Sequence, residues 1–345
     1  MTRQILVGGI PIGGGAPVVI QSMLNTKTTD VKGSLEQIRK LYAAGCQIAR
    51  LAVPNMEAAK AFGEICKESP LPLVADIHFD YRLAIASAEG GAAKIRINPG
   101  NIGGEDRVKA VVDVCKERNI PIRIGVNGGS LDKRLLEKYG HPTACALVES
   151  AFEHIALLEQ QNFTDICVSM KSSTVPTMVE AARLFRRQCD YPIHIGVTET
   201  GPVRMGLMKS AMGIGALLLD GIGDTIRVSL TDDPVEEVYA AKDILKAAGL
   251  RKEGVNIISC PTCGRTQIDL IGLVNQVDEA LKECKKPITV AVMGCVVNGP
   301  GEAREADIGI AGGDGCGMIF EKGVQIEKLP YDQLLPALLA RIEKL

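Results

Sequence analysis

The sequence predicts an α/β protein in which a TIM-type (β/α)8 barrel is followed by a smaller α/β domain. Short runs rich in Val and Ile alternate with longer amphipathic stretches about eight times before residue 250. Eight repeats in about 240 residues fit a closed barrel better than a doubly wound sheet, which usually has roughly six strands. The pattern changes after Gly249, so we expect one domain at 1–250 and a second at 251–345.

Each barrel strand is predicted from a nearly continuous apolar run, which is typical of a parallel sheet covered by helices on both faces. The eight predicted strands are Val18–Met23, Gln47–Val53, Leu71–His78, Lys94–Asn98, Ile122–Asn127, Ile166–Lys171, Ile193–Glu199 and Thr225–Leu230. The eight predicted helices are Ser34–Ala44, Glu57–Glu68, Arg82–Glu89, Glu105–Arg118, Ala144–Gln160, Val175–Cys189, Val203–Leu218 and Val235–Ala248. The glycine-rich segment Gly8–Gly15 precedes a strand and no helix follows it, so we interpret it as a hairpin that closes the barrel floor.

A different order of elements is predicted after the short linker Lys252–Gly254. A strand, a helix, a strand, a hairpin and a last helix are expected at Asn256–Ser259, Gln267–Cys284, Ile288–Met293, Ile308–Ile310 with Gly317–Val324, and Leu334–Leu345. A segment of roughly ninety residues is near the small end of what folds alone. It should form a compact α/β domain.

The bulk composition excludes several classes of protein. Hydrophobic residues make up 46% and charged residues 23%, which is typical of globular domains. A net charge of -2 and an aromatic content of 3% without tryptophan argue against nucleic-acid binding. The most apolar stretches, such as Ala211–Ile222, are broken by glycines and are shorter than the roughly 20 residues that span a membrane. Since the N-terminus has no apolar signal segment, we expect a cytoplasmic protein.

Polar side chains end the predicted strands, and cations predominate among them. The carboxyl ends of barrel strands form one rim, where active sites of such barrels lie. Four arginines and one lysine meeting there would repel one another unless an anion joined them, and guanidinium forks match phosphate oxygens. A substrate with more than one phosphate, or a diphosphate, is the inference from Arg50, Arg96, Arg123, Lys171 and Arg227.

Two further rim residues, Glu199 and His78, and the Lys171 already named have open or different roles. Glu199 is the only carboxylate interpreted as ending a strand directly, which makes it the candidate general acid or base. Lys171 has an alternative role as a Schiff-base lysine, because barrel aldolases place one at a strand end. A lone histidine such as His78 is more often structural than catalytic. We interpret the remaining histidines as structural: His141, His154 and His194.

Eleven cysteines are spread over the chain, an odd number that makes a poor disulfide framework. In a reducing compartment such cysteines are buried packing residues or metal ligands. Six of them lie in periodic apolar segments and are predicted to be packing residues: Cys46, Cys66, Cys115, Cys145, Cys167 and Cys189.

The chemistry of the smaller domain is predicted from a Cys-x-x-Cys pair, Cys260 and Cys263, and from Cys295. The pair is expected to open a helix directly after a strand, where the helix dipole stabilises thiolates. Cys295 is expected at the end of the next strand, beside the pair, with glycines that let the backbone donate to cluster sulfurs. A thioredoxin-like pair leaves Cys295 unexplained, and structural zinc normally has four Cys or His ligands. An iron–sulfur cluster with three thiolates fits best, and spacing alone leaves Cys284 and Cys316 open as a fourth ligand.

Several uncommon motifs together resemble one family. The motifs are Ser259–Arg265, Gly294–Ala303, Ile95–Asn101, Arg123–Asn127 and Val197–Glu199. They closely resemble the bacterial 4-hydroxy-3-methylbut-2-enyl diphosphate synthases, the IspG/GcpE family, and the match runs almost from end to end.

The resemblance implies a 4Fe–4S cluster on three cysteines and a glutamate, which in this chain are Cys260, Cys263, Cys295 and Glu302. It implies reduction of 2-C-methyl-D-erythritol 2,4-cyclodiphosphate in the non-mevalonate isoprenoid pathway, with electrons from flavodoxin or ferredoxin, by a homodimer. Glu199 would then supply the proton for loss of water. The implied substrate-binding residues are Arg50, His78, Arg96, Arg123, Asn127, Lys171, Arg227 and Ser229.

Two other kinds of protein remain as alternatives. One is a non-redox phosphate-binding barrel enzyme, such as an aldolase or a pterin-type synthase, with a structural metal domain. The other is an iron–sulfur redox sensor, which would give the cationic rim no role.

Overall fold

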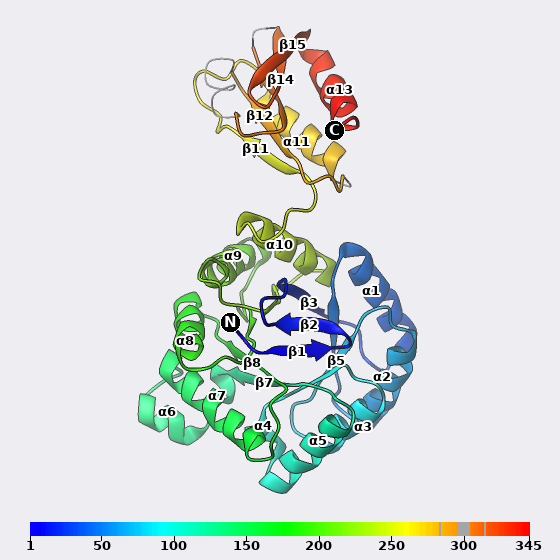
Figure 1. The fold of residues 1–345 in the computed structure, drawn as a ribbon, viewed down its shortest axis with the longest axis vertical. Coiled ribbons are helices and arrows are strands. Elements are labelled where there is room, and N and C mark those ends of the chain that lie inside the picture. The colour runs from blue at the N-terminus through cyan, green and yellow to red at the C-terminus, as the bar shows by residue number, and fades with distance from the viewer. Residues whose placement is uncertain (283, 296–303, 314) are drawn as a thin grey trace. The chain divides into compact units, whose positions relative to one another are not determined.

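A parallel sheet of eight strands, closed into a barrel, forms the centre of the larger of two compact units. The computed structural model describes residues 1–282, 284–295, 304–313 and 315–345. The units are Met1–Leu250 and Arg251–Leu345. In the larger one the strands lie in the order β8-β7-β6-β5-β4-β3-β10-β9, and a bridge between Val168 and Ile193 joins β8 to β9. The predicted barrel is confirmed, and Figure 1 shows its helices as a ring around the strands.

Each predicted strand and helix of the barrel has a counterpart. The strands are β3 (Val19–Met23), β4 (Ile48–Ala52), β5 (Leu73–Asp76), β6 (Lys94–Ile97), β7 (Ile122–Asn127), β8 (Ile166–Lys171), β9 (His194–Ile195) and β10 (Thr225–Ile226). The helices that follow them are α1 (Val31–Ala44), α2 (Met56–Glu68), α3 (Tyr81–Glu89), α5 (Glu105–Glu117), α7 (Ala144–Glu159), α8 (Val175–Gln188), α9 (Val203–Leu219) and α10 (Pro234–Ala247). Three short helices were not predicted: α4 (Pro99–Ile102), η1 (Gly128–Ser130) and α6 (Lys133–Tyr139).

Two of the strand predictions, Ile193–Glu199 and Thr225–Leu230, are too long. The apolar pattern continues beyond β9 and β10, but regular pairing covers two residues in each. The two chains stay close for a short distance, because the Arg227 N–H donates to the Ile195 carbonyl at 3.1 Å. Glu199 therefore lies four residues beyond its strand and does not end it.

A β-hairpin packs against the lower end of the barrel, as the glycine-rich segment predicts. Strand β1 (Gln4–Val7) pairs antiparallel with β2 (Ile10–Gly13), and Figure 1 shows the hairpin lying across the centre of the helix ring. Its buried side chains pack against the first inward-facing residues of the barrel strands. This cluster comprises Ile5, Val7, Ile12, Val19, Ile48, Val74 and Cys167. The hairpin thus covers the lower end of the barrel with an apolar cluster.

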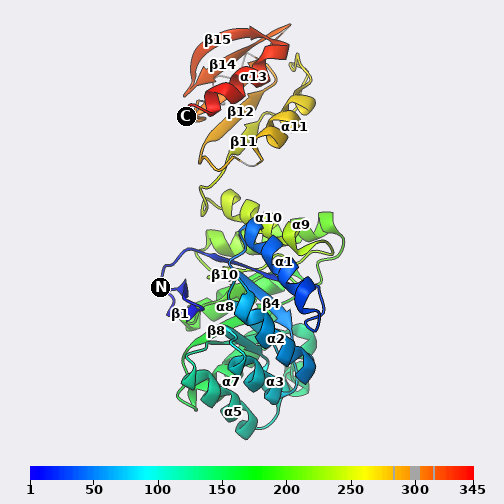
Figure 2. The same ribbon diagram turned by 90° about the vertical axis from the view of Figure 1, so that its right-hand side faces the viewer.

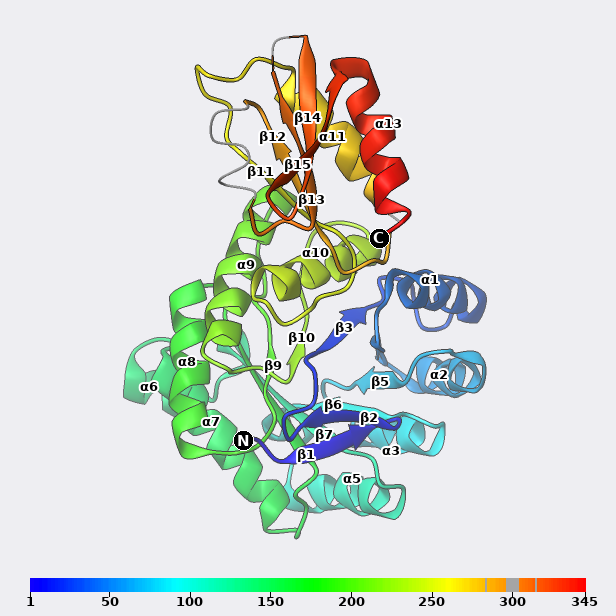
Figure 3. The ribbon, with the colours of Figure 1, turned by 45° about the horizontal axis from the view of Figure 1, so that its top comes forward.

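The smaller unit is an α/β domain with one five-stranded sheet. Strands β11 (Asn256–Ser259), β12 (Thr289–Met293) and β13 (Ile308–Gly312) pair in parallel. Strand β14 (Cys316–Glu321) pairs antiparallel with β13, and β15 (Val324–Pro330) pairs antiparallel with β14. Helices α11 (Leu270–Leu281) and α13 (Tyr331–Ile342), seen in Figures 2 and 3, share one hydrophobic cluster with Val290 and Val292 of β12. Ala291 and Met293 contribute to a second cluster, since successive side chains of a strand point to opposite faces.

Two elements of the smaller unit, α11 and β15, differ from the prediction. Asp269 caps α11 by accepting a hydrogen bond from the Gly272 N–H, so the helix begins at Leu270 and not at Gln267. Strand β15 was missed because its side chains are mostly exposed, which leaves no apolar alternation to recognise. Among the described residues of the whole chain, we find no helix with the length and apolar character required to cross a membrane.

Candidate active site

Inward-facing positions in the upper part of the barrel carry cations, where branched apolar residues usually fill such a barrel. Arg50 on β4, Arg96 on β6, Arg123 on β7 and Lys171 on β8 are 8%, 7%, 1% and 7% exposed. The parallel register places Arg96 beside Arg123, and Asn127 beside Lys171. The structure therefore brings these four cations together inside the barrel, although only Lys171 ends its strand and Arg123 lies near the beginning of β7.

Asp76, the last residue of β5, is a buried carboxylate among these cations. Its Oδ1 accepts a hydrogen bond from Arg96 Nη1 at 3.0 Å, and its Oδ2 lies 3.8 Å from Arg50 Nε and 3.4 Å from His78 Nε2. Burial alone would raise the pKa of Asp76, but the Arg50 charge, the His78 hydrogen bond and the Arg96 charge hold it well below its usual range. Asp76 thus fixes two guanidinium groups and brings the exposed His78 ring to the rim.

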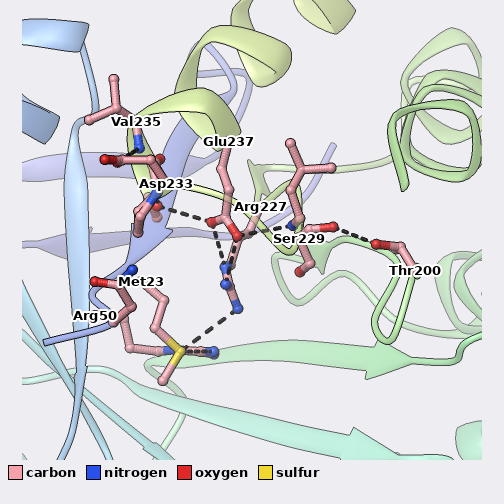
Figure 4. A network of polar contacts seen from close by, with 12 residues as sticks. Met23, Arg50, Thr200, Arg227, Ser229, Asp233, Val235 and Glu237 are labelled. Atoms are coloured by element: carbon pink, nitrogen blue, oxygen red, sulfur yellow. Dashed lines mark hydrogen bonds and ion pairs between the residues drawn. The ribbon is translucent and has the colours of Figure 1, made fainter. Parts of the chain in front are cut away.

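Glu237 is a second buried carboxylate, and it comes from the first turn of α10. Its Oε1 accepts from Arg227 Nη2 at 3.0 Å and from the Leu230 N–H at 3.1 Å. Its Oε2 accepts from Arg227 Nε at 3.2 Å and from Ser22 Oγ at 3.1 Å. Figure 4 shows the Arg227 side chain held between Glu237 and Met23.

Arg50 and Arg227 converge on the thioether of Met23. Arg50 Nε and Nη2 lie 3.2 and 2.7 Å from the Met23 sulfur, and Arg227 Nη1 lies 3.7 Å from it. The two arginines come from β4 and the β10 end, which flank β3 in the sheet. Because a thioether is a weak acceptor, these N–H groups point at a position that an anion would occupy far more favourably.

Cations exceed carboxylates in this part of the barrel. Burial lowers the pKa of Arg50 to about 10, and it lowers the pKa values of Arg123 and Lys171 well below their usual range, with neighbouring arginines adding to the effect. Arg123 Nε and Nη1 have no hydrogen-bond partner within the described part of the chain. Buried donors of this kind are normally satisfied. An anionic group from outside the chain would satisfy them and offset the repulsion.

The other predicted rim residues are less buried. Asn127 and Ser229 are half-buried, and the Ser229 carbonyl accepts a hydrogen bond from Thr200 Oγ1 at 2.6 Å. Glu199 is exposed and adopts a left-handed backbone with φ of 53°, which is uncommon for a residue other than glycine. Residues held in such conformations cluster at functional sites. The structure brings Glu199 to the loop beside Thr200, and within the described residues it shows no hydrogen bond or ion pair between Glu199 and the cations.

Four residues in or beside the barrel interior were not predicted as site residues, three of them charged. Asp76 and Glu237 orient arginines, Met23 lies between two of them, and Lys94 is fully buried with no hydrogen-bond partner for its Nζ among described residues. Burial lowers the pKa of Lys94 to about 8. A signal for Asp76 was present in the sequence, because it is a charged residue at the end of an apolar run. Glu237 lies in a helix, and only residues at strand ends were considered as site residues.

The predicted cluster cysteines lie at or beyond two neighbouring strand ends. Parallel pairing of Ser259 with Val292 places Cys260 beside the segment that leads to Cys295, and the Gly294 N–H donates to Cys260 Sγ at 3.2 Å. Cys263 is exposed, and hydrogen bonds from the Arg265 backbone and side chain lower its pKa. Backbone donors to thiolate sulfur are the contacts that stabilise iron–sulfur centres, so these residues fit a thiolate-ligated cluster.

Three details of the cysteine predictions need correction or lie outside the structure. The pair does not open a helix, because α11 begins at Leu270, seven residues after Cys263 and directly after its Asp269 cap. Glu302 lies outside the described residues, and no three His, Cys, Asp or Glu side chains among the described ones are grouped to hold a metal. Cys145, predicted to be a packing residue, is exposed at the start of α7. The other five of that set are buried or half-buried.

Comparison with known protein families agrees with this geometry. The GcpE TIM-barrel domain matches residues 2–242, and the GcpE protein C-terminal domain matches residues 256–344. The chain belongs to the GcpE family. The match covers both the cationic barrel and the cysteine domain, in the same order as the two structural units.

Relatives of the GcpE family align over almost the whole chain. A protein of Clostridium perfringens is 60% identical over 99% of this chain and 98% of its own length, and one of Geobacter sulfurreducens is 56% identical over 100% and 98%. Both are named 4-hydroxy-3-methylbut-2-en-1-yl diphosphate synthase (flavodoxin). The resemblance predicted from the motifs is therefore confirmed.

Solved structures support the barrel fold alone. A truncated 3-deoxy-D-arabino-heptulosonate 7-phosphate synthase from Thermotoga maritima has a TM-score of 0.51 at 15% identity, over 72% of this chain and 94% of that one. The dihydropteroate synthase of Yersinia pestis has a TM-score of 0.50 at 12% identity, over 72% and 100%. At such identities the likeness carries no information about substrate.

Proposed function

We propose that this GcpE-family enzyme reduces 2-C-methyl-D-erythritol 2,4-cyclodiphosphate to 4-hydroxy-3-methylbut-2-enyl diphosphate in the non-mevalonate pathway. The names of its relatives support the product and flavodoxin as electron donor, and ferredoxin is the alternative donor. The observation that carries the proposal is the surplus of buried cations in the upper barrel, with Arg123 donors unsatisfied among the described residues. A cyclic diphosphate matches that surplus in charge and in acceptor geometry.

The cations have two tasks in this reaction. They bind the diphosphate, and they stabilise the negative charge that develops on its oxygen when the ring C–O bond breaks. Arg50 and Arg227 supply converging N–H groups, and Arg96 is held in place by Asp76. Arg123, Lys171 and the rim residues His78, Asn127 and Ser229 complete the proposed set. Because carboxylates hold Arg96 and Arg227 before substrate arrives, these two groups need little reorganisation during bond cleavage.

The reaction also needs electrons and a proton. We propose that a 4Fe–4S cluster is held by Cys260, Cys263, Cys295 and Glu302, and when bound it passes electrons from the reduced donor to the substrate. The substrate gains two electrons, one C–O bond to the diphosphate breaks, and a hydroxyl leaves as water after protonation. Glu199 is the proposed proton donor, and its exposed carboxyl is carried by a loop of constrained backbone that directly follows the barrel strand β9.

The anaerobic turnover assay tests the proposal directly. Protein purified without oxygen should contain about four irons and four sulfides per chain and should convert the cyclodiphosphate with reduced flavodoxin. A non-redox barrel enzyme with a structural metal domain predicts stoichiometric zinc and no turnover. A redox sensor predicts the cluster without turnover, so the two alternatives give different outcomes.

We further propose that the enzyme is a cytoplasmic homodimer. All eleven cysteines are free, as expected in a reducing compartment. Helix α9 exposes Met205, Met208 and Met212, and a groove of about 550 Å³ between α9 and α10 is lined by described residues of which Asp243 alone is charged. A helix that is apolar on its exposed face is normally covered. Light scattering should give the molar mass of two chains.

A further inference from the structure

The carboxylate of Glu237 is saturated with hydrogen bonds. Each of its oxygens accepts two: Oε1 from Arg227 Nη2 and the Leu230 N–H, and Oε2 from Arg227 Nε and Ser22 Oγ. A carboxylate has roughly four lone-pair sites, so none remains for substrate. Glu237 is also 4% exposed. It therefore does not take part in proton transfer, and its effect on the reaction must pass through its partners.

One of these partners, Arg227, belongs to the proposed substrate site, and a second, Leu230, directly follows the site residue Ser229. The paired bonds to Nε and Nη2 fix the plane of the Arg227 guanidinium, so that Nη1 faces the Met23 sulfur at 3.7 Å, on which Arg50 also converges. The bond to the Leu230 N–H fixes the backbone directly after Ser229. One side chain thus sets the direction of an arginine and the position of a neighbouring serine (Figure 4).

We propose that Glu237 is a positioning residue that aims Arg227 at the diphosphate, an inference that rests on the proposed function. Arg227 alone could rotate about its long side chain and would lose conformational freedom on binding an anion. The ion pair with Glu237 removes this freedom of Arg227 during folding, because α10 places the Glu237 carboxylate at the end of β10. The substrate then meets a guanidinium already directed at the Met23 position.

A simpler view makes Glu237 a counter-ion that only neutralises Arg227. The two views predict opposite changes in anion affinity when Glu237 is removed. If Glu237 merely offsets charge, its removal leaves a more cationic site, which should bind an anion several-fold more tightly. If Glu237 positions Arg227, its removal weakens anion binding although the site becomes more positive, because the directed hydrogen bonds are lost.

The experiment measures binding of inorganic pyrophosphate to the full chain by calorimetry, together with KM and kcat of the reconstituted enzyme. For Glu237→Gln we expect roughly tenfold weaker pyrophosphate binding and a similarly raised KM with kcat little changed, the size of one lost charge-assisted bond. Glu237→Asp keeps the charge but withdraws the carboxylate by one methylene. Glu237→Asp should therefore also weaken pyrophosphate binding. If Glu237 were only a counter-ion, this variant would have wild-type affinity.

Controls separate this inference from the proposed function. Glu236→Asp is the matched control, since Glu236 lies in the same helix turn but outside the Arg227 network, and wild-type binding is expected. In an Arg227→Lys background, which lacks the guanidinium fork, Glu237→Gln should add no further loss. Tighter binding by Glu237→Gln, or wild-type binding by Glu237→Asp, would overturn the inference. If Arg227→Lys alone binds pyrophosphate normally, the proposed substrate site itself is wrong.

Discussion

Replacing Gly125 by alanine should displace the Arg96 guanidinium without changing any charge in the barrel. A Cβ at position 125 on β7 would lie 2.4 Å from Arg96 Nε, 2.6 Å from Nη2 and 2.8 Å from Cζ. These distances are far below van der Waals contact. Gly125 does not have a positive φ, so the backbone accepts alanine and the whole conflict falls on the arginine.

The size of the effect follows from what Arg96 would lose. Its bond from Nη1 to Asp76 Oδ1, at 3.0 Å, holds the guanidinium in place, and a displaced group could no longer direct its donors at a phosphate. One charge-assisted hydrogen bond contributes roughly 1.5–3 kcal/mol. We therefore expect pyrophosphate affinity and kcat/KM to fall by roughly ten- to a hundredfold. Overpacking costs about 1–3 kcal/mol of folding stability, which the smaller backbone entropy of alanine partly offsets.

The assay compares Gly125→Ala with a matched glycine on the loop that follows the same strand. Gly129 has open space around its Cβ position and no positive φ. An alanine there meets no clash, so Gly129→Ala should leave folding and pyrophosphate binding unchanged. Calorimetry with pyrophosphate and anaerobic kinetics then give the affinity and kcat/KM. Wild-type affinity in a folded Gly125→Ala protein would show that Arg96, in the orientation described, does not contact the anion.

Three further predictions concern the cluster, the proton donor and the barrel interior. Cys260→Ser and Cys295→Ser should lose iron and sulfide, measured colorimetrically after anaerobic purification, whereas Cys316→Ser should retain both; the reverse pattern would refute the ligand set. Glu199→Gln should keep pyrophosphate affinity and lose most turnover, and unimpaired turnover would remove Glu199 from the chemistry. Lys94 has a folded pKa of about 8 against roughly 10.4 in the unfolded chain. Below pH 8 the buried charge destabilises the fold by about 3 kcal/mol, and this penalty decreases as the pH rises toward 10.4, because the unfolded chain then binds more protons. Lys94→Met should therefore raise the free energy of unfolding by urea most at pH 7 and least near pH 10; an equal effect at both pH values would contradict the burial argument.

The barrel was predictable because its signals are long and repeated. Eight apolar runs separated by amphipathic helices leave few other architectures, and the register of parallel strands then determines which residues share a rim. Arg50, Arg96, Arg123 and Lys171 could be grouped from their strand positions alone. Shorter elements were missed: α4 and α6 lie in loops whose helices have too few apolar positions to show a period.

The partners of the cations were not predictable in the same way. Arg227 and Glu237 are ten residues apart, and their contact depends on how α10 turns back onto the end of β10. The sequence pattern gives the face of a helix but not which of its first residues reaches a neighbouring strand. Glu199 was assigned as a strand end because the apolar run continues to Thr198, while pairing ends at Ile195. Backbone pairing is a tertiary property, so the pattern overestimated the strand.

The glycines next to the cations explain how a small barrel holds such large side chains. An eight-stranded barrel is only wide enough for side chains to fill its interior, and a buried arginine is much larger than the valine usually found there. Gly125 leaves the space that the Arg96 guanidinium occupies. Gly196 has a different reason, because a Cβ there would lie 2.4 Å from the Arg227 backbone carbonyl, so the glycine allows two chain segments to approach closely. The apolar hairpin cluster at the barrel floor supplies burial that the charged upper layers cannot, which lets the barrel keep its surplus of cations for a substrate.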